Sequence, residues 1–126
     1  MRLLIDTQIF IWSVMDSERL SPRARQIILD ADDVFVSAAS IWEIAIKAKI
    51  GKLEGNPHDF VVAITGSGFQ ELPISAHHAA MLHELPLYHR DPFDRMLIAQ
   101  ALSEPLRLLT ADGMLAQYSE PVMPVT

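Results

Sequence analysis

Short apolar runs alternate with stretches of helical character along almost the whole chain. Four of these runs predict strands, at residues 3–5, 34–36, 69–74 and 106–110. A fifth run, at residues 122–125, contains Pro124 and predicts a weak strand at a sheet edge, because proline has no N–H to donate to a neighbouring strand. Strands that alternate with helices predict an α/β fold, with a mostly parallel sheet covered by helices on both faces.

Capping residues mark where several of the helices begin. A good N-cap residue directly precedes proline at three places, residues 21–22, 56–57 and 91–92. The helix that carries Glu43 begins at either Ser37 or Ser40 and ends near Gly51, since glycine is typical of helix C-termini. The other helices are predicted at residues 7–15, 75–85 and 113–117.

The length of the chain suits one domain, spanning residues 1–126. No apolar run approaches the roughly 18 residues that a membrane-spanning helix requires, and the N-terminus lacks the layout of a signal peptide. Cysteine is absent, so disulfides and thiolate metal sites are excluded. We therefore expect a cytoplasmic protein without a membrane segment.

The formal net charge is −6, from 10 basic and 16 acidic residues. Taken alone, this charge argues against a general nucleic-acid binder, because phosphate contacts need clustered cations. The argument weakens if several of the carboxylates hold a divalent cation, which would attract phosphate. Net charge therefore leaves the class of substrate open.

Acidic residues stand where an apolar run ends or a helix begins. They are Asp6, Glu43, Asp91, Asp94 and Asp112. In open α/β sheets, functional groups at such positions collect outside the carboxyl ends of the strands. Carboxylates suit hard cations such as Mg²⁺ or Mn²⁺, whereas zinc prefers histidine and cysteine. The pattern predicts that these side chains could share a cation.

Simpler explanations exist for four of the acids. Asp6 and Asp91 are each suited to cap the helix that follows. Asp94 would be favoured by the helix dipole in the first turn, and Asp112 is an ordinary turn residue before glycine. Capping and cation binding can coexist on one carboxylate, so both interpretations stay open.

Glu43 has two interpretations that depend on where its helix begins. If the helix begins at Ser40, Glu43 completes a capping box with that serine. If it begins at Ser37, Glu43 lies deeper, among apolar side chains, and needs a partner or a metal. The sequence alone leaves these interpretations about even.

Histidine and aromatic residues offer no competing site. His77, His78 and His83 lack the i, i+4 spacing that brings two imidazoles together, and we expect them on the surface of a helix. We expect the larger aromatic residues in the core: Phe10, Trp12, Trp42 and Phe93.

Four segments together resemble the PIN-domain family, and more closely the VapC-type toxins of bacterial toxin–antitoxin pairs. The segments are LLIDT at 3–7, SAASIWEI at 37–44, HRDPFDRMLIAQA at 89–101 and LTAD at 109–112. They occur in the order and spacing of that family over nearly the whole chain. The resemblance implies an α/β/α sandwich and an Mg²⁺- or Mn²⁺-dependent endoribonuclease, usually a homodimer, restrained by a cognate antitoxin protein.

The resemblance also ranks the acids. Asp6, Glu43 and Asp94 match the first three acids of the family, and Asp112 matches a fourth, more variable one. We expect these four to be the catalytic, metal-binding residues, whereas Asp91 belongs to the subfamily motif and is less expected as a ligand. Two departures from the usual pattern are Gln8 and Ala111.

Substrate contacts are expected from two hydroxyl positions and from nearby cations. Thr7 and Thr110 match hydroxyl positions beside the first and fourth acids, and the candidates for phosphate contacts are Arg90, Arg95, Lys47 and Lys49. RNA is the expected substrate. The alternatives are a PIN-fold interaction module with a weak site and a housekeeping nuclease without an antitoxin.

Overall fold

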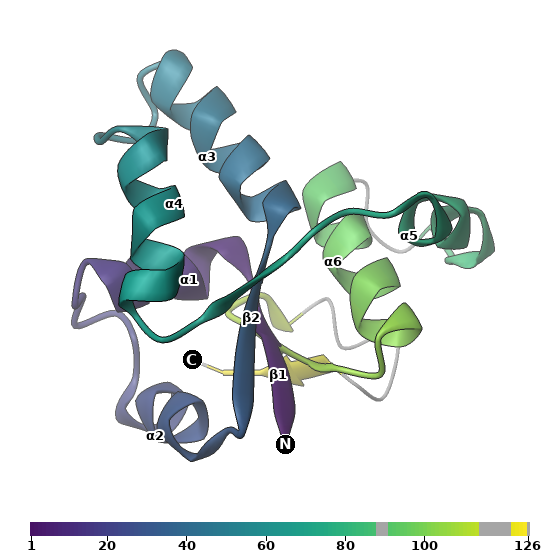
Figure 1. Ribbon diagram of the computed structural model, residues 1–126, viewed down its shortest axis with the longest axis horizontal. Coiled ribbons are helices and arrows are strands. Elements are labelled where there is room, and N and C mark those ends of the chain that lie inside the picture. Colours follow the sequence, from purple (N-terminus) through teal and green to yellow (C-terminus); the bar gives the residue numbers. More distant parts are fainter. Residues whose placement is uncertain (88–90, 114–121, 126) are drawn as a thin grey trace.

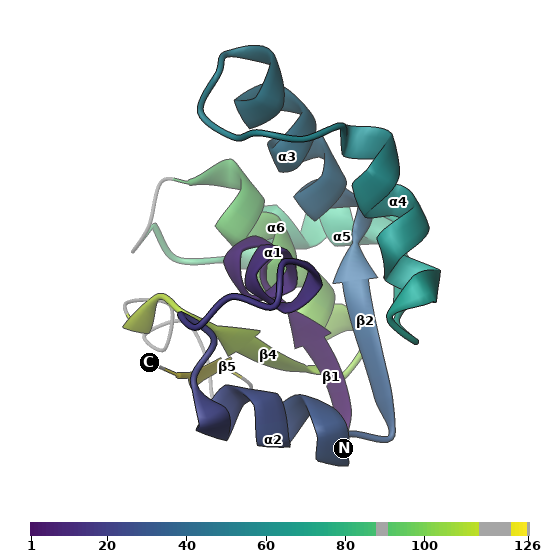
Figure 2. The ribbon, with the colours of Figure 1, turned by 90° about the vertical axis from the view of Figure 1, so that its left-hand side faces the viewer.

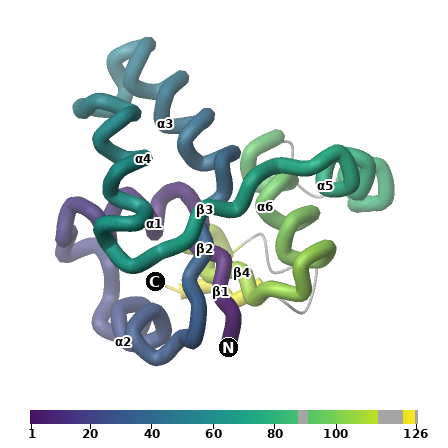
Figure 3. Tube along the Cα trace, in the orientation of Figure 1, coloured from purple at the N-terminus to yellow at the C-terminus, as the bar shows by residue number. Residues whose placement is uncertain are grey.

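The computed structural model describes residues 1–87, 91–113 and 122–125 and contains a parallel five-stranded sheet (Figure 1). The strand order is β3-β2-β1-β4-β5, and every pairing is parallel. The strands are β1 (Arg2–Ile5), β2 (Asp33–Ser37), β3 (Gln70–Leu72), β4 (Arg107–Thr110) and β5 (Val122–Pro124). The first strand therefore lies in the centre of the sheet, between β2 and β4 (Figure 3).

Helices connect these strands in the predicted alternation. They are α1 (Thr7–Val14), α2 (Pro22–Asp30), α3 (Ala38–Lys49), α4 (Pro57–Gly66), α5 (Ala76–Met81), the 3₁₀ turn η1 (Leu82–Glu84) and α6 (Pro92–Ser103). The three predicted N-caps are confirmed. The side chains of Ser21, Asn56 and Asp91 accept backbone N–H bonds at the starts of α2, α4 and α6. None of the helices in the described ranges is long and apolar enough to cross a membrane.

Two apolar clusters cover the two faces of the sheet, as the alternation of side chains along a strand requires. Leu3 and Ile5 of β1 point into a cluster that includes residues of α1, α2 and α4, whereas Leu4 points into a cluster built with α6. Figures 1 and 2 show α1, α2 and α4 on one side of the strands and α5 and α6 on the other. The predicted α/β/α sandwich is confirmed.

The carboxyl ends of the central strands lie side by side. Ile5 is in register with Val36 of β2 and with Leu109 of β4. The residues that follow, Asp6, Ser37 and Thr110, are therefore brought to one edge of the sheet. Helices leave this edge on both faces of the sheet, which is the point where such folds place their sites.

Ser37, and not Ser40, begins the helix that carries Glu43. The Ser37 side chain accepts the backbone N–H of Ala39, and Ser40 is fully buried inside the first turns of α3. The capping-box interpretation of Glu43 is therefore wrong, and the deeper placement is confirmed. Helix α5 is shorter than predicted, because the last turn of the predicted helix forms the 3₁₀ turn η1. Strand β3 is also shorter than predicted. The helix predicted at residues 113–117 lies almost wholly outside the described residues.

His78 and Trp42 lie in the opposite environments to those predicted. His78 is 2% exposed: its Nδ1 accepts the Ser75 N–H at 3.0 Å, and its Nε2 lies 2.7 Å from a Glu104 carboxylate oxygen. These partners stabilise an imidazole that would otherwise be costly to bury. Trp42 is 58% exposed, and its ring packs edge-to-face on Phe93 at 5.0 Å. The expectation of a core position is confirmed for Phe10, which is fully buried.

Candidate active site

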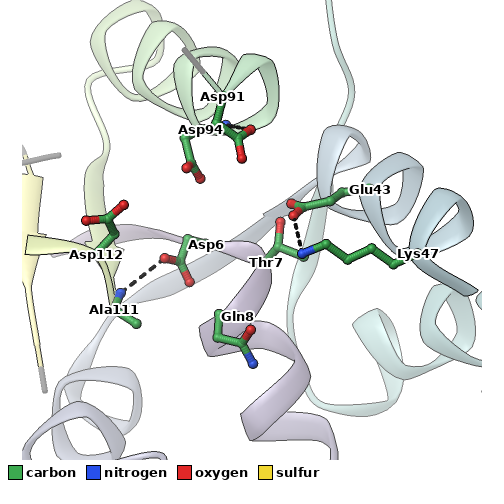
Figure 4. A pocket seen from close by; sticks show the side chains of 9 residues that line it. All are labelled: Asp6, Thr7, Gln8, Glu43, Lys47, Asp91, Asp94, Ala111 and Asp112. Atoms are coloured by element: carbon green, nitrogen blue, oxygen red, sulfur yellow. Dashed lines mark hydrogen bonds and ion pairs between the residues drawn. The ribbon is translucent and has the colours of Figure 1, made fainter. Parts of the chain in front are cut away.

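A pocket of about 270 Å³ opens at the carboxyl edge of the sheet (Figure 4). It is lined by Asp6, Thr7, Gln8, Glu43, Lys47, Asp91, Asp94, Ala111 and Asp112. The structure thus brings together all five acids that the sequence analysis selected, from the ends of β1 and β4 and from α3 and α6. Among the described residues that line it, five carboxylates face one ammonium group, that of Lys47.

Asp6 is the most constrained of these carboxylates. Its Oδ1 accepts the Ile9 N–H at 2.8 Å and so caps α1. Its Oδ2 accepts the Thr110 hydroxyl at 2.6 Å and the Ala111 N–H at 3.1 Å. Capping and participation in the pocket therefore coexist, and bonds from both neighbouring segments fix the orientation of the side chain.

Burial raises the pKa of Asp6 above its ordinary value of 3.8. The hydrogen bonds from Thr110, Ile9 and Ala111 oppose this rise, whereas the charge of Glu43 adds to it. A carboxylate that is costly to ionise in the free protein favours a nearby cation, because opposite charge stabilises its ionised form.

Glu43 carries a buried oxygen for which the described residues provide no hydrogen-bond partner. The residue is 8% exposed, and its Oε2 lies 2.8 Å from Lys47 Nζ. Within the described ranges, Oε1 is buried and has no hydrogen-bond partner. Leaving such an acceptor unpaired costs about 1–3 kcal/mol, or more for a charged group, so the environment of Glu43 suits a bound cation.

Asp91, Asp94 and Asp112 complete the acidic lining. Asp91 Oδ1 accepts the N–H groups of Phe93 at 2.9 Å and Asp94 at 3.2 Å, which confirms Asp91 as a helix cap. The Asp112 N–H donates to the Thr110 hydroxyl at 3.0 Å. In Figure 4 the Asp94 side chain points toward the space above Asp6, with Asp112 beside it.

The donor set fits a hard divalent cation in kind, since it consists of carboxylate oxygens. As the side chains stand, the described residues include no group of three or more histidine or acidic side chains arranged closely enough to hold an ion. Holding a cation there would therefore require other carboxylates of the lining to rotate toward Asp6, whose orientation is fixed by its hydrogen bonds. The unpartnered Oε1 of Glu43 identifies one side chain that would gain a bond by doing so.

The expected substrate contacts lie in different places. Thr7 lines the pocket, but its hydroxyl donates to Ser40 Oγ at 2.9 Å. Thr110 is fully buried, and its hydroxyl is used on Asp6. Arg95 is not among the lining residues and donates instead to the carbonyl oxygens of Leu82 and Pro86. Arg90 lies outside the described residues.

Two polar residues contribute to this site without having been selected as functional. Ser40 lies fully buried and accepts the Thr7 hydroxyl, and Gln8 lines the pocket. The spacing of Ser40 three residues before Glu43 on α3 is the signal that could have identified it, because residues i and i+3 share a helix face.

An α/β/α sandwich with an acid-lined pocket at the carboxyl edge of its sheet defines the class of protein, and residues 3–121 match the PIN domain family. The chain belongs to this family, which confirms the resemblance seen in the sequence. Ribonuclease VapC22 of Mycobacterium tuberculosis is 30% identical, over 98% of this chain and 96% of that protein.

Solved structures agree on the fold. VapBC2 from Rickettsia felis, bound to a promoter DNA fragment, superposes with a TM-score of 0.73 at 12% identity, covering 100% of both chains. A toxin–antitoxin complex from Klebsiella pneumoniae gives a TM-score of 0.67 at 22% identity, over 96% of this chain and 95% of that one. At these identities the likeness concerns the fold alone.

In the absence of divalent cations, we expect the free energy of unfolding to fall as pH rises from 3.8 to the raised folded-state pKa of Asp6, more in the unmodified protein than in Asp6→Asn. The folded-state pKa of Asp6 is raised above 3.8, so across this window the folded protein retains a proton that the unfolded chain has lost. Chemical denaturation in chelator between about pH 4 and about pH 8 measures the difference. If the free energies of unfolding of the two proteins depend on pH in the same way, then burial does not raise the pKa of Asp6.

Proposed function

We propose that this protein is a divalent-metal-dependent endoribonuclease that serves as the toxin of a toxin–antitoxin pair. The observation that carries the proposal is the buried Oε1 of Glu43, which has no hydrogen-bond partner among the described residues and belongs to a residue that lines the same pocket as Asp6, Asp94 and Asp112. A buried charge that is incompletely paired destabilises the fold, and in a non-enzymatic interaction module no function would offset that cost.

Asp6, Glu43, Asp94 and Asp112 are the residues that would hold Mg²⁺ or Mn²⁺, with Asp91 retained mainly as a helix cap. The cation would neutralise charge on the phosphodiester and activate the attacking water. Hydrogen bonds from Thr110 and Ala111 hold Asp6 in one orientation, so its carboxylate needs little reorganisation.

Lys47 has a separate role in this proposal. In the free protein its ammonium pairs with Glu43 Oε2, which offsets part of the repulsion between the five carboxylates. A cation bound by Glu43 would release Lys47 from that pairing. The released side chain, which is 42% exposed, can then face the phosphate of the substrate.

The biological setting is proposed from the relatives. Ribonuclease VapC22 supports RNA as the substrate, and the Rickettsia and Klebsiella toxin–antitoxin complexes support a cognate antitoxin as a protein partner. We further propose a homodimer in the cytoplasm, where bacterial RNA is available. A neighbouring gene for a small DNA-binding antitoxin would favour the toxin role over that of a housekeeping nuclease.

Cleavage of single-stranded RNA tests the activity directly. With Mg²⁺ or Mn²⁺ present, the purified protein should convert an internally labelled RNA into defined fragments, and excess chelator should abolish this conversion. Replacing the chelated metal with fresh Mn²⁺ should restore it. Equal cleavage in chelator would rule out the proposed metal, and no cleavage with either metal would favour the interaction-module alternative.

A further inference from the structure

A second cavity, of about 260 Å³, adjoins the acidic pocket between α3 and the start of α6. Its lining residues are Glu43, Ile46, Lys47, Ile50, Lys52, Asp91, Pro92 and Phe93. Three of them, Glu43, Lys47 and Asp91, also line the acidic pocket, so the two cavities are neighbours along one surface. We call this second cavity the flanking groove.

The flanking groove exposes apolar side chains that a folded chain would ordinarily bury. Ile46 is 41% exposed and Ile50 is 59% exposed, one helical turn apart at the end of α3. Phe93 lies opposite them, and the exposed Trp42 packs on its ring with an interplanar angle of 84°. Contiguous exposed apolar surface of this kind marks a binding surface.

Two ammonium groups stand beside this apolar surface. Lys47 connects the flanking groove to the acidic pocket, and Lys52 is exposed at the end that follows α3. The two carboxylates of the groove, Glu43 and Asp91, belong to the part that is shared with the acidic pocket. Beyond that part, the aromatic and aliphatic side chains and the ammonium group of Lys52 are complementary to a nucleotide. Single-stranded nucleic acid is held in such grooves by stacking of bases on aromatic rings and by cations along the backbone.

We propose that the flanking groove is a nucleotide subsite, which holds the residue of single-stranded RNA next to the phosphodiester that is cleaved. The base lies against Phe93 and the two isoleucines, and the adjoining phosphate faces Lys52 and the released Lys47. This inference rests on the proposed function and adds a place where substrate specificity is set. The groove is continuous with the acidic pocket and carries two lysines, and both features favour RNA as the occupant. A second copy of this chain would need only an apolar face.

Trp42 provides a reporter of binding to this groove. The chain has two tryptophans, Trp12 and Trp42, so a Trp12→Phe background isolates the one that packs on Phe93. With Ca²⁺ in place of Mg²⁺ to slow cleavage, a short single-stranded RNA should quench the Trp42 emission in a saturable way. The same RNA with an abasic residue at the occupied position should bind more weakly and quench less.

Two variants separate a role in binding from a role in stability. Phe93→Leu keeps apolar volume but removes the stacking ring, and it should raise the RNA Kd on the order of fivefold to a hundredfold. Lys52→Gln removes an exposed charge, which leaves the fold intact, and should raise the Kd and weaken its dependence on salt. Arg23→Gln on α2, also exposed, is the control that removes one charge far from the groove.

The outcomes distinguish this inference from the proposed function. Unchanged Trp42 emission and an unchanged Kd in Lys52→Gln, with RNA still cleaved in Mg²⁺, would overturn the subsite and leave the nuclease assignment standing. Emission that depends on protein concentration and not on RNA would overturn it in favour of an interface between copies. Loss of both cleavage and RNA binding in the unmodified protein would overturn the two proposals together.

Discussion

Replacing Asp6 by asparagine should lower kcat for RNA cleavage by roughly a thousandfold. The proposed metal stabilises the charge of the transition state by several kcal/mol, and each 1.36 kcal/mol that is lost costs a factor of ten. Asparagine is itself a good N-cap, so the bond to Ile9 N–H can persist and the protein should fold. Initial rates at saturating RNA and Mn²⁺ measure the effect.

Two further variants make this result specific. Glu43→Gln should show a loss of similar size, because it removes the charge of the side chain that carries the unpartnered oxygen. Asp30→Asn makes the same chemical change at an exposed position on α2 and should cleave at the normal rate. Retention of more than about a tenth of the activity by both site variants would disprove the carboxylate site.

Replacing Leu108 by alanine should lower the free energy of unfolding strongly. Leu108 is fully buried in β4, in register with Leu4, and belongs to the cluster that α6 covers. Truncation of a buried leucine costs about 3–5 kcal/mol, from lost transfer free energy and from the cavity that remains. Domains of this kind have a free energy of unfolding of only about 5–15 kcal/mol, so Tm should fall by roughly 10 °C or more.

Leu87→Ala is the matched control for this measurement. Leu87 is 82% exposed, so the same truncation there should change the free energy of unfolding by less than about 0.5 kcal/mol. Urea denaturation of the two variants gives the comparison. A loss below about 1 kcal/mol for Leu108→Ala would mean that the sheet is not packed as described.

The sequence was most informative where structure depends on neighbours along the chain. Strands appeared as apolar runs, and the helix starts at Ser21, Asn56 and Asp91 were recognisable because an N-cap bonds to N–H groups two or three residues away. Pro124 lies in the edge strand β5, as its missing N–H requires. The parallel sheet then followed from the alternation of strands and helices.

Features that depend on distant contacts were harder to predict. The environment of His78 is built by Gln100 on α6 and by Glu104, 26 residues away, at the C-cap of that helix. The exposure of Trp42 depends on which face of α3 the sheet and α6 leave uncovered. The acids could be selected from their positions in the sequence. The local pattern was compatible with a helix start at Ser37 or at Ser40, so it did not settle whether Glu43 lies buried or completes a capping box.

The bond between Asp6 and Thr110 joins residues that are 104 positions apart in the chain. During synthesis, Asp6 and Glu43 are therefore made well before β4 (Arg107–Thr110), the strand whose end anchors Asp6. Until β4 emerges and pairs with β1, β1 lacks one of its two neighbours in the sheet, and Asp6 lacks the hydroxyl and N–H groups that orient it. On the proposed function, a growing chain is therefore harmless to the RNA that is being translated until β4 has emerged and paired with β1.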